Sequence, residues 1–154
     1  MLLVAAACPF AAIADTFRGV VTHVTDGDTL WVRPNGQRQA IEIRLLDIDA
    51  PEGCQAFGPQ ATTALAARVL KQPVVVRTRG RDDYRRTLAR VQHRNQDIGA
   101  WMVGEGHAWS TSYKGRPGRY QRLQEQARRK GIGLWAAPHA VEPRSFRRSH
   151  GRCL

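Results

Sequence analysis

The first third of the chain reads as three β-rich stretches separated by residues that favour turns. The stretches cover residues 17–24, 29–33 and 39–48, and short breaks of turn-forming residues divide them. Asn35 and Gly36 lie between the second and third stretches, and an Asn-Gly pair is a strong signal for a two-residue hairpin. We therefore predict three strands, with a hairpin turn before the third.

A helical pattern follows these strands. Within residues 60–71, Ala61, Leu65 and Val69 recur every four positions, as expected for a helix that buries one face. A Gly-Pro pair opens this run and Pro73 ends it, because proline disrupts a helix interior. The pattern predicts one amphipathic helix after the third strand.

Two more strands and two more helices complete the pattern. Residues 74–79 and 86–93 are β-rich and are joined by a short turn segment, which indicates a second hairpin. One helix is predicted to begin at Asp97, and another to end at Lys130, where Gly131 follows. The side chains predicted to be buried in these helices are Ile98, Trp101, Met102, Tyr120, Leu123 and Ala127.

This order of elements predicts an α+β fold. Three strands, a helix, two strands and two helices match a five-stranded OB-fold β-barrel with about three α-helices, although order alone does not prove that arrangement. We predict one folded domain at residues 15–137 and a basic tail at residues 138–154, where Pro, Arg, Ser and His occur without a period. A chain of 154 residues has room for one such domain and not for two large ones.

The first 14 residues carry no charge and are rich in small and apolar side chains. An Ala-Ile-Ala sequence before Asp15 suits cleavage by signal peptidase, and the segment is shorter than the roughly 20 residues that a transmembrane helix needs. We predict a signal peptide at residues 1–14 and a secreted or periplasmic protein. No Lys or Arg precedes the apolar run, so a start further upstream and an additional buried helix or strand stay open as alternatives.

The charge balance indicates a polyanionic partner. The chain has 24 Lys and Arg against 13 Asp and Glu, a net charge of +11. Nearly all the basic residues are Arg, whose planar group grips phosphate through two hydrogen bonds, although GC-rich codon usage explains the Arg-to-Lys ratio equally well. The last predicted helix lacks the bulky apolar face that interfacial insertion needs, so we expect no stable membrane insertion. We also expect a monomer.

Two cysteines remain after the predicted leader, Cys54 and Cys153. In an oxidising compartment they can form a disulfide that ties the C-terminal tail to the segment after Glu52. Two separate thiols are an equally good interpretation of the sequence. A zinc site is a weaker one, because the histidines show none of the short paired spacings of structural zinc sites.

Three acidic residues stand out against the basic background. Asp28 follows an Asp-Gly turn, and Asp49 and Glu52 flank Pro51. Neighbouring carboxylates repel each other unless a cation lies between them, and hard divalent ions prefer such oxygen ligands. Asp is also a common turn residue, so each position taken alone favours the structural interpretation.

Five short motifs occur in an order and spacing that resemble the staphylococcal-nuclease-like (thermonuclease) family. They are DGDT at residues 26–29, RLLDIDAPE at residues 44–52, DYRRTLARV at residues 83–91, GHAW at residues 106–109 and GIGLW at residues 131–135. The resemblance covers residues 17–136, which is nearly all of the predicted domain. Five motifs in the same order are hard to attribute to chance.

The resemblance implies a calcium site and a catalytic base. It assigns Ca²⁺ binding to the side chains of Asp28 and Asp49 and to the backbone carbonyl of Ala50, a role that tolerates the small side chain. It assigns to Glu52 the positioning or deprotonation of the attacking water. The short connection after this residue is expected to leave the site more open.

The resemblance also implies that Arg44 and Arg86 hold the phosphate. Guanidinium groups and a cation aimed at the phosphate stabilise the transition state of hydrolysis more than the ground state. This chain has Arg85 where the family commonly has Gly, so the phosphate contact could shift to it, although the register favours Arg86. The residues predicted to contact substrate, with ordinary packing as the alternative for the tyrosines, are Tyr84, Arg85, Tyr113 and Lys114.

Together these features lead to one expected function and one alternative. We expect an exported, calcium-dependent nuclease that acts on DNA and RNA with little sequence preference and, as the resemblance implies, leaves 3′-phosphate ends. The alternative is a noncatalytic OB-fold module that binds nucleic acid. A pure binder has no need of neighbouring buried carboxylates, so the acidic cluster argues for the enzyme.

Overall fold

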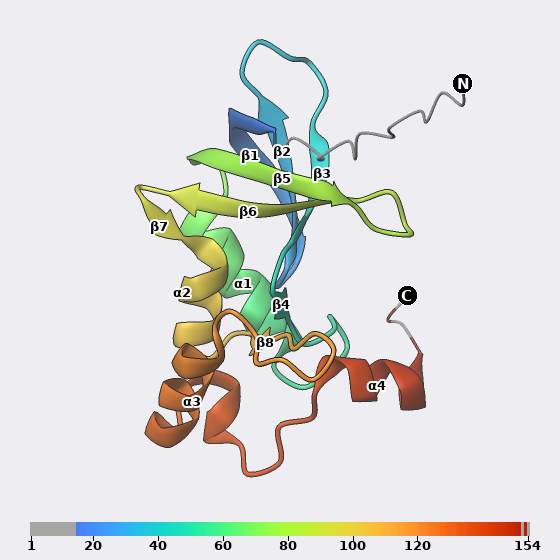
Figure 1. The fold of residues 1–154 in the computed structure, drawn as a ribbon, viewed down its shortest axis with the longest axis vertical. Helices are drawn as coiled ribbons and strands as arrows, with labels where there is room; N and C mark the ends of the chain where they lie inside the picture. The colour runs from blue at the N-terminus through green and yellow to red at the C-terminus, as the bar shows by residue number, and fades with distance from the viewer. Residues whose placement is uncertain (1–14, 152, 154) are drawn as a thin grey trace, which may run out of the picture.

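Five strands close into a β-barrel in the computed structural model, which describes residues 15–151 and 153 (Figure 1). The strands are β1 Thr16–Asp26, β2 Thr29–Pro34, β3 Ile41–Leu45, β5 Pro73–Arg81 and β6 Thr87–His93. They follow the order β3-β2-β1-β5-β6 through antiparallel pairs, and a parallel pairing of β3 with β6 closes the barrel. The predicted five-stranded OB-fold barrel in an α+β fold is confirmed. The predicted signal peptide at residues 1–14 lies outside the described residues.

The third predicted strand is divided in two by the structure. Strand β3 ends at Leu45, and Asp47 adopts a left-handed backbone with φ of 67° before the short strand β4 Ile48–Asp49 begins. The Asp47 carboxylate accepts two hydrogen bonds from Arg90, at 2.9 Å and 2.7 Å, which hold this unusual turn. Strand β4 leaves the barrel and pairs with β8 Trp109–Ser110, while β7 Gln96–Asp97 turns back and pairs antiparallel with the end of β6. The break carries Asp49 and the following turn to the end of the barrel.

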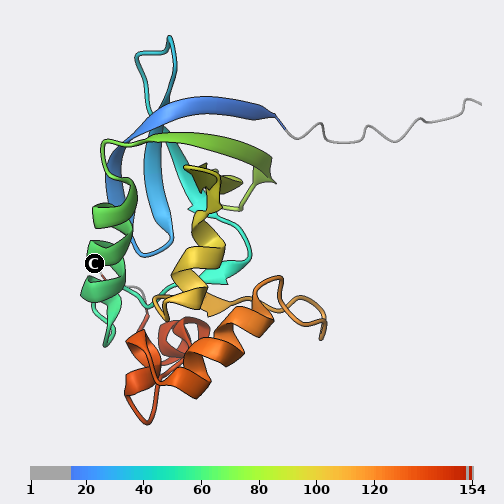
Figure 2. The same cartoon turned by 90° about the vertical axis from the view of Figure 1, so that its left-hand side faces the viewer.

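The helices gather at one end of the barrel (Figures 1 and 2). They are α1 Gly58–Val69, α2 Ile98–Gly104, the 3-10 helix η1 Gly133–Ala136, α3 Gln121–Lys130 and α4 Pro143–His150. Helix α1 buries Ala61, Leu65 and Val69, the face that its four-residue spacing predicts. In α2 and α3 the predicted burial holds for Ile98, Met102, Tyr120 and Ala127, whereas Trp101 and Leu123 are only partly buried against the core.

Helix α4 was not predicted from the sequence and adds a fourth α-helix to the predicted fold. It lies within residues 138–154, begins with Pro143 at its first turn, and has basic side chains in its last turn. Only Pro143 of its eight residues is buried. An apolar repeat therefore never develops, which is why periodicity did not reveal the helix.

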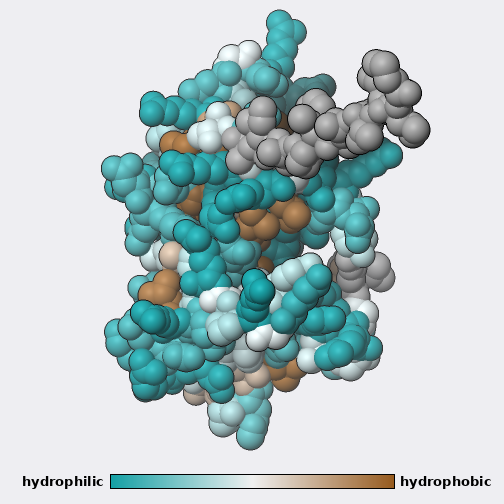
Figure 3. Space-filling model, in the orientation of Figure 1, coloured by the Kyte–Doolittle hydropathy of each residue, from teal (hydrophilic) through white to brown (hydrophobic). Residues whose placement is uncertain are grey.

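The disulfide that the sequence left open is present and joins distant parts of the chain. Cys54 and Cys153 are bonded, with their Cα atoms 5.6 Å apart and a sequence separation of 99. It fastens the segment after α4 to the turn between β4 and α1. Within the described part of the chain, no helix is long and apolar enough to cross a membrane, and the face seen in Figure 3 is mostly hydrophilic.

Candidate active site

A polar cavity of about 310 Å³ at the end of the barrel collects most of the predicted site residues. The predicted residues that line it are Asp28, Arg44, Asp49, Ala50, Glu52, Tyr84 and Arg86. They come from the β1–β2 turn, from β3, from β4 and the turn after it, and from the β5–β6 hairpin. The fold therefore brings together side chains that lie far apart in the sequence.

Asp28 is held at the bottom of this cavity by a very close backbone approach. A side chain at Gly27 would meet the Cβ atoms of Ala50 and Ala61 at 2.7 Å and 2.9 Å, so only glycine lets the β1–β2 turn pack there. The Asp28 Oδ2 atom then accepts a 2.7 Å hydrogen bond from the backbone N–H of Ala50. Burial raises the pKa of Asp28 to about 6, outweighing the neighbouring Arg44 that lowers it.

Arg44 connects the two predicted metal-binding carboxylates. Its Nη2 atom lies 3.0 Å from Asp28 Oδ2 and 3.1 Å from Asp49 Oδ1. Its Nη1 atom donates hydrogen bonds to the backbone carbonyls of Leu45 and Ile48, at 2.9 Å and 3.1 Å. Two carboxylates that contact one nitrogen atom must converge, so Asp28 and Asp49 form one acidic centre.

The turn after β4 places Glu52 beside this centre. Its backbone N–H donates a 3.1 Å hydrogen bond to the side-chain oxygen of Gln55. A Cβ atom at Gly58 would lie 1.8 Å from the carbonyl oxygen of Glu52, so the start of α1 packs directly on this turn. The Glu52 side chain stays about one-fifth exposed, at 21%, which leaves it accessible to water.

Arg86 reaches the cavity from the β5–β6 hairpin, where Asp82 holds it. The Asp82 Oδ2 atom accepts hydrogen bonds from Arg86 Nε and Nη2, both at 2.8 Å. Its Oδ1 atom accepts from the backbone N–H groups of Tyr84 and Arg86, at 3.0 Å and 2.9 Å. Burial opposes ionisation, but these hydrogen bonds prevail and lower the pKa of Asp82. Asp82 was not among the predicted site residues, because its side-chain contacts depend on the hairpin geometry.

Three predicted residues do not line the cavity: Arg85, Tyr113 and Lys114. Arg85 is exposed at the hairpin tip with φ of 65°, in the position where the family commonly has Gly. Tyr113 is 72% exposed in the loop before α3, and Lys114 lies over its ring at 5.3 Å. The structure thus favours Arg86 over Arg85, and the substrate roles of the loop pair stay predictions.

Arg147 of α4 is a component of the site that sequence reasoning placed in the tail. Its Nη1 and Nη2 atoms contact Asp49 Oδ1 and Oδ2 at 3.1 Å and 3.0 Å, and Nη1 contacts Glu52 Oε1 at 2.7 Å. Hydrogen bonds to Asp49, and then to Glu52, raise the pKa of Arg147 above its ordinary value. The only sequence signal was indirect, since a Cys54–Cys153 bond would bring the tail to this turn.

The donor groups of the cavity fit a hard divalent cation. Asp28 and Asp49 offer carboxylate oxygens, Ala50 lines the same cavity, and both carboxylates are buried, so a nearby cation would stabilise their charge. Among the residues that the structure describes, no three Asp, Glu, His or Cys side chains are already grouped to hold a metal ion. A cation here would therefore also need backbone oxygen atoms or water as ligands.

The raised pKa of Asp28 predicts a pH dependence of folding in the presence of chelator. The Asp28 carboxyl binds its proton more tightly in the folded protein than in the unfolded chain. Its contribution to the free energy of unfolding is therefore complete below about pH 4 and is lost as pH rises through about 6. Between pH 4 and 7, the wild type should lose roughly 2 kcal/mol of unfolding free energy relative to Asp28→Asn. Urea denaturation of both proteins at several pH values measures this difference. Parallel pH profiles would contradict it.

Comparison with known proteins agrees with this geometry. The family described as "Staphylococcal nuclease homologue" matches residues 42–137. The chain is 41% identical to "Protein ParB" of Escherichia coli, over 96% of this chain and 91% of that protein. It is 43% identical to "Micrococcal nuclease" of Shigella flexneri, over 86% of this chain and 82% of that protein. An "Uncharacterized endonuclease" of Haemophilus influenzae is 41% identical, over 83% of this chain and 71% of that protein.

Fold and site together define an OB-fold protein with an acidic centre flanked by guanidinium groups. The matched segment and the relatives then give the family, because they cover most of the chain. The protein belongs to the staphylococcal nuclease family. This confirms the family resemblance of the five sequence motifs.

Proposed function

We propose that this protein is an exported, calcium-dependent nuclease that hydrolyses DNA and RNA with little sequence preference and leaves 3′-phosphate ends. The coarser statement, a nuclease that hydrolyses phosphodiester bonds, follows from the family and from similarity to nucleases over most of the chain. One observation carries the finer proposal. The acidic centre of Asp28 and Asp49 shares a cavity with a partly exposed base candidate, Glu52, and with Arg44 and Arg86.

Glu52 is the proposed general base. Its carboxylate lies at the edge of the cavity, where it can accept a proton from the attacking water. Arg86, fixed by Asp82, presents guanidinium N–H groups to the same space and would hold the non-bridging oxygens of the phosphate. Arg44 would share this role from the floor of the cavity.

A divalent cation held by Asp28, Asp49 and the carbonyl of Ala50 would supply positive charge against the charge that develops on the phosphate. The proposed metal-binding set contains only hard oxygen donors, which suits Ca²⁺ and its flexible coordination shell. Arg44 contacts both carboxylates and so holds them close to one another.

The positive charge on the barrel surface suits a nucleic-acid backbone. Arg77, Arg79 and Arg81 are exposed along β5, and none forms an ion pair with a carboxylate of the described chain. Tyr84 lines the cavity with 60% of its surface exposed, so its ring can stack on a base of any type. Contacts to phosphate and unspecific stacking support low sequence preference.

Binding should weaken steeply with salt, because such contacts release counterions. With about four phosphate contacts, the affinity for a single-stranded oligonucleotide should fall about 50-fold between 50 and 200 mM NaCl. Fluorescence anisotropy in chelator, which prevents cleavage, measures this slope for two oligonucleotides of different base composition. Salt-independent binding, or a large difference between the two sequences, would contradict the proposed mode of recognition.

Export and a monomeric state are further parts of the proposal. The Cys54–Cys153 disulfide supports an oxidising compartment, where such bonds persist.

The chemistry is tested by the ends of the products. A labelled oligonucleotide is digested by purified protein with CaCl₂, and the fragments are offered to a DNA polymerase before and after phosphatase treatment. The proposal predicts fragments that prime synthesis only after phosphatase has removed a 3′-phosphate. Fragments that prime directly would contradict the proposed products. Folded protein that binds the oligonucleotide but leaves it intact would instead support the noncatalytic OB-fold module.

A further inference from the structure

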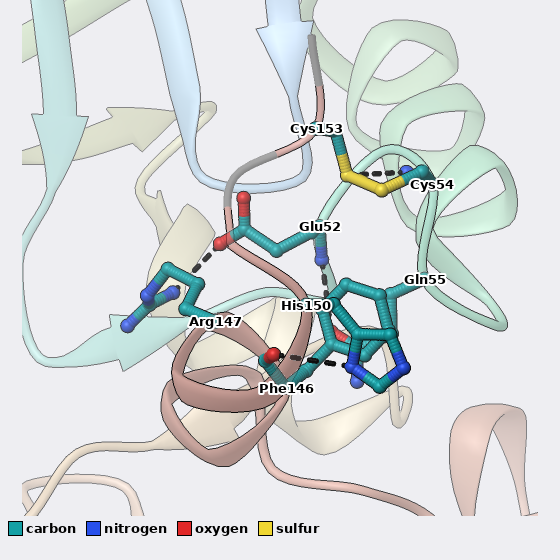
Figure 4. Close-up of a disulfide and its surroundings, with 7 residues drawn as sticks. All are labelled: Glu52, Cys54, Gln55, Phe146, Arg147, His150 and Cys153. Carbon is teal, nitrogen blue, oxygen red and sulfur yellow. Dashed lines mark hydrogen bonds and ion pairs between the residues drawn. A yellow bond between two sulfur atoms is a disulfide. The ribbon is translucent and has the colours of Figure 1, made fainter.

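Helix α4 carries a guanidinium group into the acidic centre from outside the barrel. Figure 4 shows Arg147 pointing from α4 toward Glu52, with the Cys54–Cys153 disulfide beyond the same turn. The short connection after Glu52 was expected to leave the site more open. In the structure, Arg147 lies on that side, with its side chain 31% exposed.

The contacts of Arg147 involve the oxygen atoms that the reaction would need. It engages both carboxylate oxygens of Asp49, at 3.1 Å and 3.0 Å, and Oε1 of Glu52 at 2.7 Å. A divalent cation at Asp49 and a proton acceptor at Glu52 both require these lone pairs. A fixed positive charge in this position also repels an approaching cation.

The docking of α4 is weak apart from these contacts. Only Pro143 of the helix is buried, and a largely apolar cavity of about 510 Å³ lies between α4 and the body, with Phe57 and Phe146 among its lining residues. Besides the contacts of Arg147, a 2.7 Å hydrogen bond from Gln55 Nε2 to the carbonyl of Val141 holds the segment just before α4. The disulfide therefore does much to keep Arg147 near the site.

We propose that Arg147 is a built-in competitor of the divalent cation, held in place by α4 and the Cys54–Cys153 disulfide, so that α4 must release Asp49 and Glu52 before the site can act. The ligand concerned is the divalent cation of the proposed function, on which this inference rests. Because Arg147 belongs to the same chain, the competition is intramolecular, and the disulfide further raises the effective concentration of the guanidinium group at the site. The competition between Arg147 and the cation would then set the calcium concentration at which α4 releases the site.

The size of the effect follows from population arithmetic. If α4 is docked about 90% of the time, the apparent affinity for the cation is reduced about tenfold relative to the open site. Removing the Arg147 side chain should raise the apparent affinity for the cation by the same factor of about ten. The same helix offers a matched control, Arg148, which carries the same charge. Arg148 is exposed, donates a 3.2 Å hydrogen bond to the Ser145 hydroxyl and forms no ion pair with a carboxylate of the described residues.

Calcium binding to the full-length protein, measured by isothermal titration calorimetry with CaCl₂, tests the inference without relying on activity. Arg147→Ala should bind Ca²⁺ about tenfold more tightly than the wild type, and Arg148→Ala should stay within about twofold. Cys54→Ser/Cys153→Ser should also bind more tightly, because it lowers the effective concentration of Arg147. Adding Arg147→Ala to that variant should bring it to the affinity of Arg147→Ala alone.

Several results would overturn the inference. Equal affinity of wild type and Arg147→Ala would do so, as would an equal gain in Arg148→Ala, which would indicate only the general electrostatic field. The absence of Ca²⁺ binding in every variant also overturns it, together with the proposed calcium dependence. A turnover that falls in Arg147→Ala at saturating CaCl₂ would show that Arg147 assists the substrate instead. Loss of plasmid digestion by all variants, with the affinity difference intact, would count against the proposed function alone.

Discussion

Replacing Glu52 by Gln is expected to lower turnover by about 100- to 10,000-fold, the usual contribution of a general base. The amide has the size of the carboxylate but cannot accept the proton of the attacking water. Nucleic-acid affinity should change little, since Glu52 contacts Arg147 and not the proposed phosphate ligands. The measurement is kcat on a labelled oligonucleotide at saturating CaCl₂, with affinity measured separately in chelator.

Glu125→Gln is the matched control for this substitution. Glu125 lies exposed on α3, where its Oε1 atom accepts a 3.1 Å hydrogen bond from Gln121, and it does not line the active-site cavity. Its substitution removes the same charge and should leave kcat unchanged. If Glu52→Gln and Glu125→Gln both turn over at the wild-type rate, Glu52 is not the base.

Replacing Arg86 by Ala should lower turnover by about 100- to 1,000-fold, the typical cost of one transition-state hydrogen-bond donor. Asp82 fixes the guanidinium group of Arg86 toward the cavity, so the geometry is ready before substrate binds. Arg85→Ala is the control, because Arg85 is adjacent, carries the same charge and does not line the cavity. It should affect mainly the salt-dependent binding of substrate.

Asp82→Ala separates positioning from charge. It leaves Arg86 in place but removes the contacts that orient it, so it should lower kcat by a smaller factor than Arg86→Ala does. Adding Asp82→Ala to Arg86→Ala should lower kcat little further, because the two residues act together. If Arg85→Ala loses more turnover than Arg86→Ala, Arg85 rather than Arg86 makes the phosphate contact.

Local patterns in the sequence were sufficient to predict most of the strands and helices. Helix α1 shows why, because the spacing of Ala61, Leu65 and Val69 is set by the same face that packs against the strands. The break between β3 and β4 could not be predicted in this way. It depends on the ion pair of Asp47 with Arg90, which lies on another strand, and a long-range contact leaves no local period.

The site was predictable only where the motifs of the family exist. The roles of Asp28, Asp49 and Glu52 came from that resemblance, since each also reads as an ordinary turn residue. The structure adds the physical reason that the Asp-Gly-Asp turn has its glycine, which is the close approach of Gly27 to Ala50. Arg147 carries no comparable signal, because an eight-residue helix with one buried residue has no apolar face to detect.

The account depends most directly on whether a divalent cation at the acidic centre drives hydrolysis. Purified, folded protein is incubated with supercoiled plasmid in CaCl₂ or in chelator, and Asp28→Asn and Asp49→Asn are treated in parallel. We expect loss of the plasmid with CaCl₂, intact plasmid in chelator, and strongly reduced digestion by both variants. Plasmid that survives wild-type protein in CaCl₂, or that is digested equally well in chelator, would contradict it.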